Sequence, residues 1–244
     1  MSDALNPTLS QEAEDALPTA LVTEVCPRLP LDPERTTELY RYLGYPAGFA
    51  PSARMGERIA KVVAQAQSSL QPRGVYAIYA VTRQTEHSLQ VGGVTISGKI
   101  GEFLQQSQRV AAFVVTVGED ISHLSGAAAR NGDAFSAWVM DALGSWAAES
   151  AAGALMKRIR RHLNDGQELT LRYSPGYCGM SIAEQRKLFQ LVPACAVEVD
   201  LTPSLLMRPM KSISGLVGLA PKDVVSRYHS PCDLCPLARC PMRR

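Results

Sequence analysis

The chain has 244 residues, enough for one large domain or two small ones with a substantial core. Hydrophobic residues make up 46% of the sequence and charged residues 20%, as in an ordinary globular protein. Lys and Arg number 25 against 23 Asp and Glu, which gives a formal charge of +2. This balance excludes a strong field of one sign, so we expect no nucleic-acid partner.

Residues 1–20 are polar and acidic and include Pro7 and Pro18, which predicts a flexible N-terminal arm. The first basic residue is Arg28, so the basic start and apolar run of a secretory signal are both missing. No stretch of eighteen apolar residues occurs, which predicts no membrane span. We therefore expect a cytoplasmic protein without a membrane partner.

Residues 21–120 are expected to form an N-terminal α+β part. Apolar residues spaced three and four apart predict the clearest of its helices, and β-branched and aromatic residues predict its strands. The expected elements are helices over 33–42 and 53–70 and strands over 74–81, 89–96 and 109–117.

Residues 121–221 are expected to form a second part. Asp133 can cap a long, alanine-rich helix that runs to about His162. Ser181 and Glu184 have the spacing of a capping box, which predicts a helix to about Val192. The remaining expected elements are a strand over 167–173 and extended segments over 195–201 and 210–219. Helices and strands do not alternate strictly, so the pattern favours an α+β fold over a doubly wound sheet.

The segment Arg172–Gly179 connects the expected strand to the capped helix. Pro175 and Gly176 indicate an irregular loop whose backbone can approach a ligand closely. Arg172 could pair with a carboxylate, and Tyr177 could stack on a ligand or donate a hydrogen bond. These residue types alone are equally typical of an ordinary strand-to-helix loop.

A second run alternates small hydroxyl residues with apolar ones. It contains Leu201-Thr202-Pro203-Ser204, Met207, Pro209 and Ser212-Ile213-Ser214-Gly215. Taken alone, this pattern is typical of a half-buried strand with Thr and Ser on its solvent face.

Together the two runs resemble the activation domain of cobalamin-dependent methionine synthase. That family has an Arg-x-x-x-Gly-Tyr-Pro stretch followed by Leu-Thr-x-Ser, Met-x-Pro and Ser-Val-Ser-Gly, in the same order and spacing. The resemblance covers roughly residues 133–219 and departs at Cys178, where the family has proline. It implies a twisted, mostly antiparallel sheet with helices.

The resemblance also implies a binding site for S-adenosylmethionine. The residues that match the family's motifs are Arg172, Pro175, Gly176, Tyr177, Ser212, Ser214 and Gly215. Glu149, on the long helix, is expected on a solvated face instead. No residue is expected to act as a general acid or base, because the family's nucleophile is cobalt.

Residues 222–244 form a Cys-rich tail. Cys232, Cys235 and Cys240 lie close together, and clustered thiols in a reducing compartment indicate a metal site. The fourth ligand could be Cys178, Cys195, Cys26 or His229, and we favour Cys178 because it falls in the expected ligand loop. Sulfur ligands favour an iron–sulfur cluster, with structural zinc as the alternative.

The function that these observations predict is accessory to a methyltransferase. The chain would bind S-adenosylmethionine and support reductive methylation of cob(II)alamin on a partner, with the metal site as an electron relay. The partner would be a corrinoid protein, or a methionine synthase lacking its own activation domain, and a reductant protein could take part. Two alternatives stay open: a zinc-stabilised docking or scaffold module, and a stand-alone S-adenosylmethionine-dependent methyltransferase, which the lack of a Gly-x-Gly-x-x-Gly loop disfavours.

Overall fold

The computed structural model describes residues 20–32, 38–46, 48–225, 230 and 233–235. The expected arm and much of the Cys-rich tail therefore lie outside the described residues. The helices are α1 (Leu39–Tyr42), α2 (Ala53–Ala66), α3 (Ile100–Phe103), α4 (Asp120–Arg130), α5 (Ala134–Ile159), α6 (Glu184–Leu191) and α7 (Lys222–Val225). The strands are β1 (Val22–Cys26), β2 (Arg73–Gln84), β3 (Ser88–Val91), β4 (Val94–Ser97), β5 (Arg109–Thr116), β6 (Gln167–Leu169), β7 (Asp200–Leu201), β8 (Met207–Arg208) and β9 (Ser212–Pro221).

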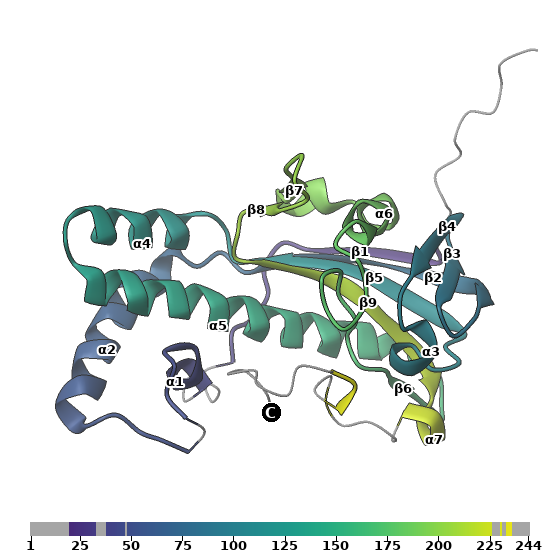
Figure 1. Ribbon diagram of the computed structural model, residues 1–244, viewed down its shortest axis with the longest axis horizontal. Helices are drawn as coiled ribbons and strands as arrows, with labels where there is room; N and C mark the ends of the chain where they lie inside the picture. Colours follow the sequence, from purple (N-terminus) through teal and green to yellow (C-terminus); the bar gives the residue numbers. More distant parts are fainter. Residues whose placement is uncertain (1–19, 33–37, 47, 226–229, 231–232, 236–244) are drawn as a thin grey trace, which may run out of the picture.

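The core of the fold is an antiparallel sheet with the strand order β4-β3-β2-β5-β9-β6, and β1 pairs with the first half of β2. Helix α5 lies along one face of this sheet, and α6 with the β7–β8 hairpin lies on the other (Figure 1). Apolar residues fill both interfaces, so β5 is buried on both faces. This arrangement confirms the predicted α+β class and the mostly antiparallel sheet.

Helix α5 packs closely on the sheet because small residues line its inner face. Gly144, Ala147 and Ala151 are buried there, and the Asp133 carboxylate caps the helix by accepting the Ser136 N–H at 3.0 Å. Small side chains allow the backbone of a helix to approach a sheet closely, which brings polar residues of the helix near the sheet's edge. The predicted cap and the predicted long helix are both confirmed.

The structure differs from the sequence predictions in several details. Residues 89–96 form the β3–β4 hairpin, because Gly92 and Gly93 both adopt positive φ and reverse the chain. Strand β1 was not predicted. The segment expected to be extended from Cys195 begins with a 3₁₀ turn over Ala194–Val197.

The predicted capping box is also wrong. The Ser181 hydroxyl accepts the N–H of Ala183 instead of an N–H in the first turn of α6. The Glu184 carboxylate accepts the N–H of Ser97 and pairs with Lys187, so it ties α6 to β4. The capped helix is present, but its acidic residue makes a tertiary contact.

The predicted boundary near residue 120 falls inside one continuous sheet. Strand β5, which precedes the boundary, pairs along its length with β9, which follows it. The division into an N-terminal and an activation-like part stays a prediction. No helix in the described ranges is long and apolar enough to cross a membrane.

A partly buried polar network attaches β1 to the helical layer. The Tyr76 hydroxyl donates to the Glu24 carboxylate at 2.5 Å and lies 2.8 Å from Nε2 of His162, while Arg158 donates to the same carboxylate at 2.9 Å. The hydrogen bond from Tyr76 and the Arg158 charge hold the pKa of Glu24 below its ordinary value. Burial raises the pKa of the neighbouring Cys26 thiol to about 11, which favours the thiol over the reactive thiolate.

Tyr76→Phe should lower the free energy of unfolding by about 1–3 kcal/mol at neutral pH, because a carboxylate loses a buried hydrogen bond. Since the folded pKa of Glu24 lies below its ordinary value of 4.5, this contribution is complete above that pH and is lost as the pH falls through the folded pKa. Urea titrations at neutral pH and near pH 3 measure both effects. A loss in Tyr76→Phe that is equally large at both pH values would contradict this account.

Candidate functional site

A cavity of about 500 Å³ opens on the face of the sheet that carries α6. Its walls come from the segment between β6 and α6, the first residues of β9 and the chain from the β7–β8 connection to Met210. Single residues of α3, α5 and α6 complete them. Five of the residues predicted to bind S-adenosylmethionine line it: Arg172, Pro175, Tyr177, Ser212 and Ser214. The structure thus brings together two sequence motifs that lie about 40 residues apart.

The two predicted glycines shape the cavity without lining it. A Cβ on Gly215 would lie 2.8 Å from the Ser174 hydroxyl and 2.9 Å from the Tyr173 carbonyl oxygen, so only glycine lets this segment approach β9. Gly176 has a φ of +86° in the turn that carries Tyr177. Both glycines determine where the neighbouring cavity-lining side chains lie.

Arg172 and Glu149 form a charged pair at one end of the cavity. Nη2 of Arg172 donates to Oε2 of Glu149 at 2.6 Å. Nη1 of Arg172 is buried and has no hydrogen-bond partner among the described residues. A buried guanidinium nitrogen without a partner is costly, and a bound acceptor would satisfy it.

Glu149 does not lie on a solvated face, as the sequence had suggested, but at the cavity. Its side chain is 35% exposed and reaches Arg172 from the middle of α5. Helical periodicity alone does not distinguish it from Asp141, which is 63% exposed and pairs with Lys211 at 2.7 Å. The alanine-rich sequence around Glu149 could have indicated its position, because small residues let α5 pack close to the sheet and bring Glu149 near it.

The two predicted serines are already engaged in hydrogen bonds within the protein. Ser214 is 3% exposed and pairs with the buried amide of Gln185 at 2.8–3.0 Å. The Ser212 hydroxyl donates to the Pro209 carbonyl at 2.6 Å. These serines therefore hold α6 and the β8–β9 connection against the cavity floor, in addition to lining it.

Large apolar side chains surround the mouth of the cavity. We call this set the apolar rim, and it consists of Tyr177, Ile182, Leu206 and Met210, which are 69%, 48%, 62% and 72% exposed. Exposed apolar side chains gathered around one opening mark a ligand or partner surface, whereas scattered ones do not. The cavity thus combines a charged inner end with an apolar entrance.

Cys178 lines the cavity in an unusual backbone conformation. Its φ is +43°, and Gly179 follows at +88°. A proline, which the resembled family has here, cannot adopt this φ. The change to cysteine therefore comes with a different local path of the chain.

The predicted metal ligands are only partly described. Cys235 is half-buried and follows Leu234, which packs against the same apolar cluster as Cys178. Cys232 and Cys240 lie outside the described residues. Within the part that the structure describes, no group of three or more His, Cys, Asp or Glu side chains could hold a metal ion, and the metal site stays a prediction.

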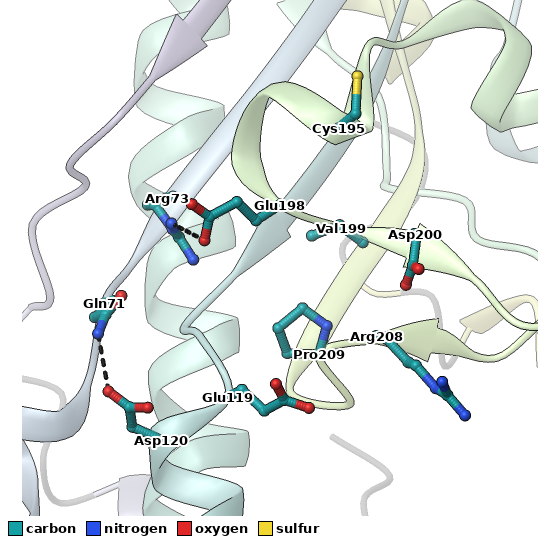
Figure 2. Close-up of a pocket in the computed structure, with 10 residues that line it drawn as sticks. All are labelled: Gln71, Arg73, Glu119, Asp120, Cys195, Glu198, Val199, Asp200, Arg208 and Pro209. Atoms are coloured by element: carbon teal, nitrogen blue, oxygen red, sulfur yellow. Dashed lines mark hydrogen bonds and ion pairs between the residues drawn. The ribbon is translucent and has the colours of Figure 1, made fainter.

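A second cavity, of about 640 Å³, lies beside the base of the β7–β8 hairpin (Figure 2). Two contacts join its polar groups: Arg73 pairs with Glu198 at 2.6 Å, and Gln71 donates to Asp120 at 2.9 Å. Nε of Arg73 is buried and has no hydrogen-bond partner among the described residues. Cys195, a possible metal ligand by sequence, lies here and not at the first cavity. The second cavity contains none of the predicted ligand-binding residues.

The structure is an α+β domain in which the two sequence motifs line one cavity. The sequence of residues 47–230 matches the family model for the activation domain of vitamin B12 dependent methionine synthase, and the chain belongs to this family. The resemblance noted in the sequence is thereby confirmed. No curated protein sequence matches the chain.

A solved structure described as the MetH reactivation domain bound to AdoHcy has a similar fold. The TM-score is 0.59 at 19% sequence identity, and the match covers 85% of this chain and 82% of that one. At this identity the similarity establishes the shared fold. The family match supports a role as a reactivation domain in a B12-dependent context.

Gly215→Ala should destabilise the protein by about 1–3 kcal/mol, because the added methyl group has no space against the Tyr173–Ser174 backbone. Gly56→Ala, in the first turn of α2, is the control: its Cβ would meet atoms only at 4.0 Å, and the gain in helix propensity should stabilise by up to about 0.5–1 kcal/mol. Thermal unfolding of both variants tests the packing at β9. Equal stability of Gly215→Ala and the wild type would show that this contact is loose.

Proposed function

We propose that the chain binds S-adenosylmethionine in the first cavity, and that the methyl group of this ligand is transferred to the corrinoid of a partner protein. The observation that supports this most directly is the buried Nη1 of Arg172 beside the Glu149 carboxylate. An α-amino acid group presents a carboxylate and an ammonium at adjacent positions. An arginine and a glutamate side by side are complementary to that pair of charges.

The rest of the cavity suits the remainder of the methyl donor. Tyr177 offers an aromatic ring to a purine or a sulfonium, and Met207 and Ile213 add apolar surface. The similar reactivation domain is described as bound to AdoHcy, the product of methyl transfer from this donor. The chemical class of the ligand is thus an adenosyl amino acid.

The apolar rim supports docking of the partner over the cavity. Its four side chains are exposed around the entrance, where a methyl group would have to leave. The partner would be a corrinoid protein or a methionine synthase without its own activation domain. The chain's contribution is to hold the donor's methyl carbon in line with the partner's cobalt, and proximity is the main source of the rate gain.

The reaction balances with one external electron. A reductant first transfers one electron to the partner's cob(II)alamin and so forms cob(I)alamin. A separate protein could serve as this reductant. The cobalt electron pair then attacks the methyl carbon, the carbon–sulfur bond breaks, and its electrons stay on sulfur as the AdoHcy thioether. Neither step needs a general acid or base from this chain.

The cysteines supply a further part of the proposal. Cys178 at the cavity and Cys235, anchored by Leu234 in the same apolar cluster, fit soft-metal ligation by thiolates together with Cys232 and Cys240. An iron–sulfur cluster held by these residues would supply one-electron chemistry beside the methyl donor. Structural zinc is the alternative, and it would make the tail a purely stabilising element.

Arg172→Ala should weaken AdoHcy binding at least about tenfold, because a charged hydrogen bond to the ligand is lost. Isothermal titration of the wild type, Arg172→Ala and Arg160→Ala measures this effect. Arg160 is the matched control, since it forms an ion pair with Glu168 away from the cavity. If the wild type fails to bind AdoHcy, or if both variants bind as the wild type does, the proposed methyl-donor site is wrong.

Protein purified without oxygen should contain about four irons and matching sulfide per chain, with a broad charge-transfer band. Cys178→Ala should lose the band, whereas Cys195→Ala, in the second cavity, should keep it. About one zinc per chain and no colour would overturn the electron relay and leave a structural metal. Retention of the band in Cys178→Ala would remove Cys178 from the ligand set.

A further inference from the structure

We propose that Tyr173 is a positioning residue for the methyl-donor cavity. Its hydroxyl holds the cavity loop, residues 174–180, in the conformation that presents Tyr177 and Cys178 to the ligand. The part of this inference that concerns ligand affinity depends on the proposed function. The part that concerns the loop does not.

The Tyr173 side chain is itself rigidly placed. It is 1% exposed, and its ring stacks on Phe103 with the ring centroids 4.1 Å apart and an interplanar angle of 7°. Its backbone N–H and carbonyl both bond to Leu216 of β9, at 2.9 and 2.8 Å. With ring and backbone fixed, the position of the hydroxyl is fixed as well.

The hydroxyl connects two segments that are distant in sequence. It accepts the N–H of Lys99 at 2.9 Å and donates to the carbonyl oxygen of Cys178 at 3.2 Å. Gly98 leaves the space for this contact, since a Cβ there would lie 2.7 Å from the hydroxyl oxygen. The turn between β4 and α3 and the cavity loop are thereby joined through one side chain.

The cavity loop needs such a constraint because its backbone is unfavourable. Gly176, Cys178 and Gly179 all have positive φ, and Cys178 is not a glycine. Conformations of this kind persist only where the surroundings determine them. The hydrogen bond from Tyr173 acts on the carbonyl of the one non-glycine residue among the three.

The hydroxyl is a dependable donor at neutral pH. A phenol carries its proton at neutral pH. Because Lys99 supplies the N–H that the oxygen accepts, the proton is available to the Cys178 carbonyl. The direction of the two hydrogen bonds is therefore fixed.

The test compares Tyr173→Phe with Tyr79→Phe. Tyr79 is a matched control: it is 5% exposed, lies in the same apolar cluster, and donates its hydroxyl to the Leu191 carbonyl at 2.7 Å. Both variants keep the ring and lose one buried hydroxyl. Tyr173→Phe should lose more thermal stability than Tyr79→Phe, because the Tyr173 hydroxyl makes two hydrogen bonds and the Tyr79 hydroxyl makes one.

Hydrogen exchange should distinguish the variants without any ligand. Amides of the cavity loop should exchange about tenfold faster in Tyr173→Phe, as expected for one lost hydrogen bond, and at the wild-type rate in Tyr79→Phe. Equal exchange in the cavity loop of both variants would overturn the positioning role. Gly98→Ala, which pushes a methyl group against the hydroxyl, gives a second variant if Tyr173→Phe folds poorly.

Titration with AdoHcy then tests the consequence for the ligand. The dissociation constant should rise about tenfold in Tyr173→Phe and stay unchanged in Tyr79→Phe. Faster exchange with unchanged affinity would overturn the link between loop position and binding. If exchange rises selectively but the wild type binds no AdoHcy, the proposed function fails while the loop role of Tyr173 is supported.

Discussion

The pairing of β5 with β9 is the interaction on which the rest of the structure depends. It extends from Arg109–Leu219 to Thr116–Ser212 and joins segments about 100 residues apart in the chain. Strand β9 then receives Tyr173 on its other side, and Gly215 permits the close approach. Without this pairing, the two motifs that line the cavity would have no common surface.

The polar groups that line the cavity differ in whether they find hydrogen-bond partners within the protein. The serines are engaged inside the protein, and so is the amide of Gln185. Arg172 retains one buried nitrogen without a partner among the described residues. A site whose hydrogen bonds are all complete would have little to offer an incoming charged ligand, whereas one incomplete guanidinium gives both affinity and orientation.

The sequence predicted the elements whose signals are local. The valine-rich run of β5, the Asp133 cap and the extended β9 follow from residue types and spacing. Strand β1 was missed because its exposure alternates at a sheet edge and its polar Glu24 is satisfied by Tyr76, which lies about 50 residues away. Such long-range compensation leaves no local signal.

The candidate site was predictable only with the family resemblance. Arg172 and Tyr177 are unremarkable as residue types in a loop, and the motif match singled them out. Glu149 and Tyr173 were not predicted as site residues, because their roles come from the packing of α5 and from the contact with Lys99. Periodicity describes which face of an element is buried, and it does not identify the polar residue that meets a partner from elsewhere in the chain.

The apolar rim also favours self-association of the chain and lowers its solubility. Leu206 and Met210 are well exposed, and a formal charge of +2 provides little repulsion between copies. Replacing the rim with polar residues should improve solubility and would remove the surface on which the proposed partner would dock. Under that proposal, solubility and recognition place opposite demands on the same side chains.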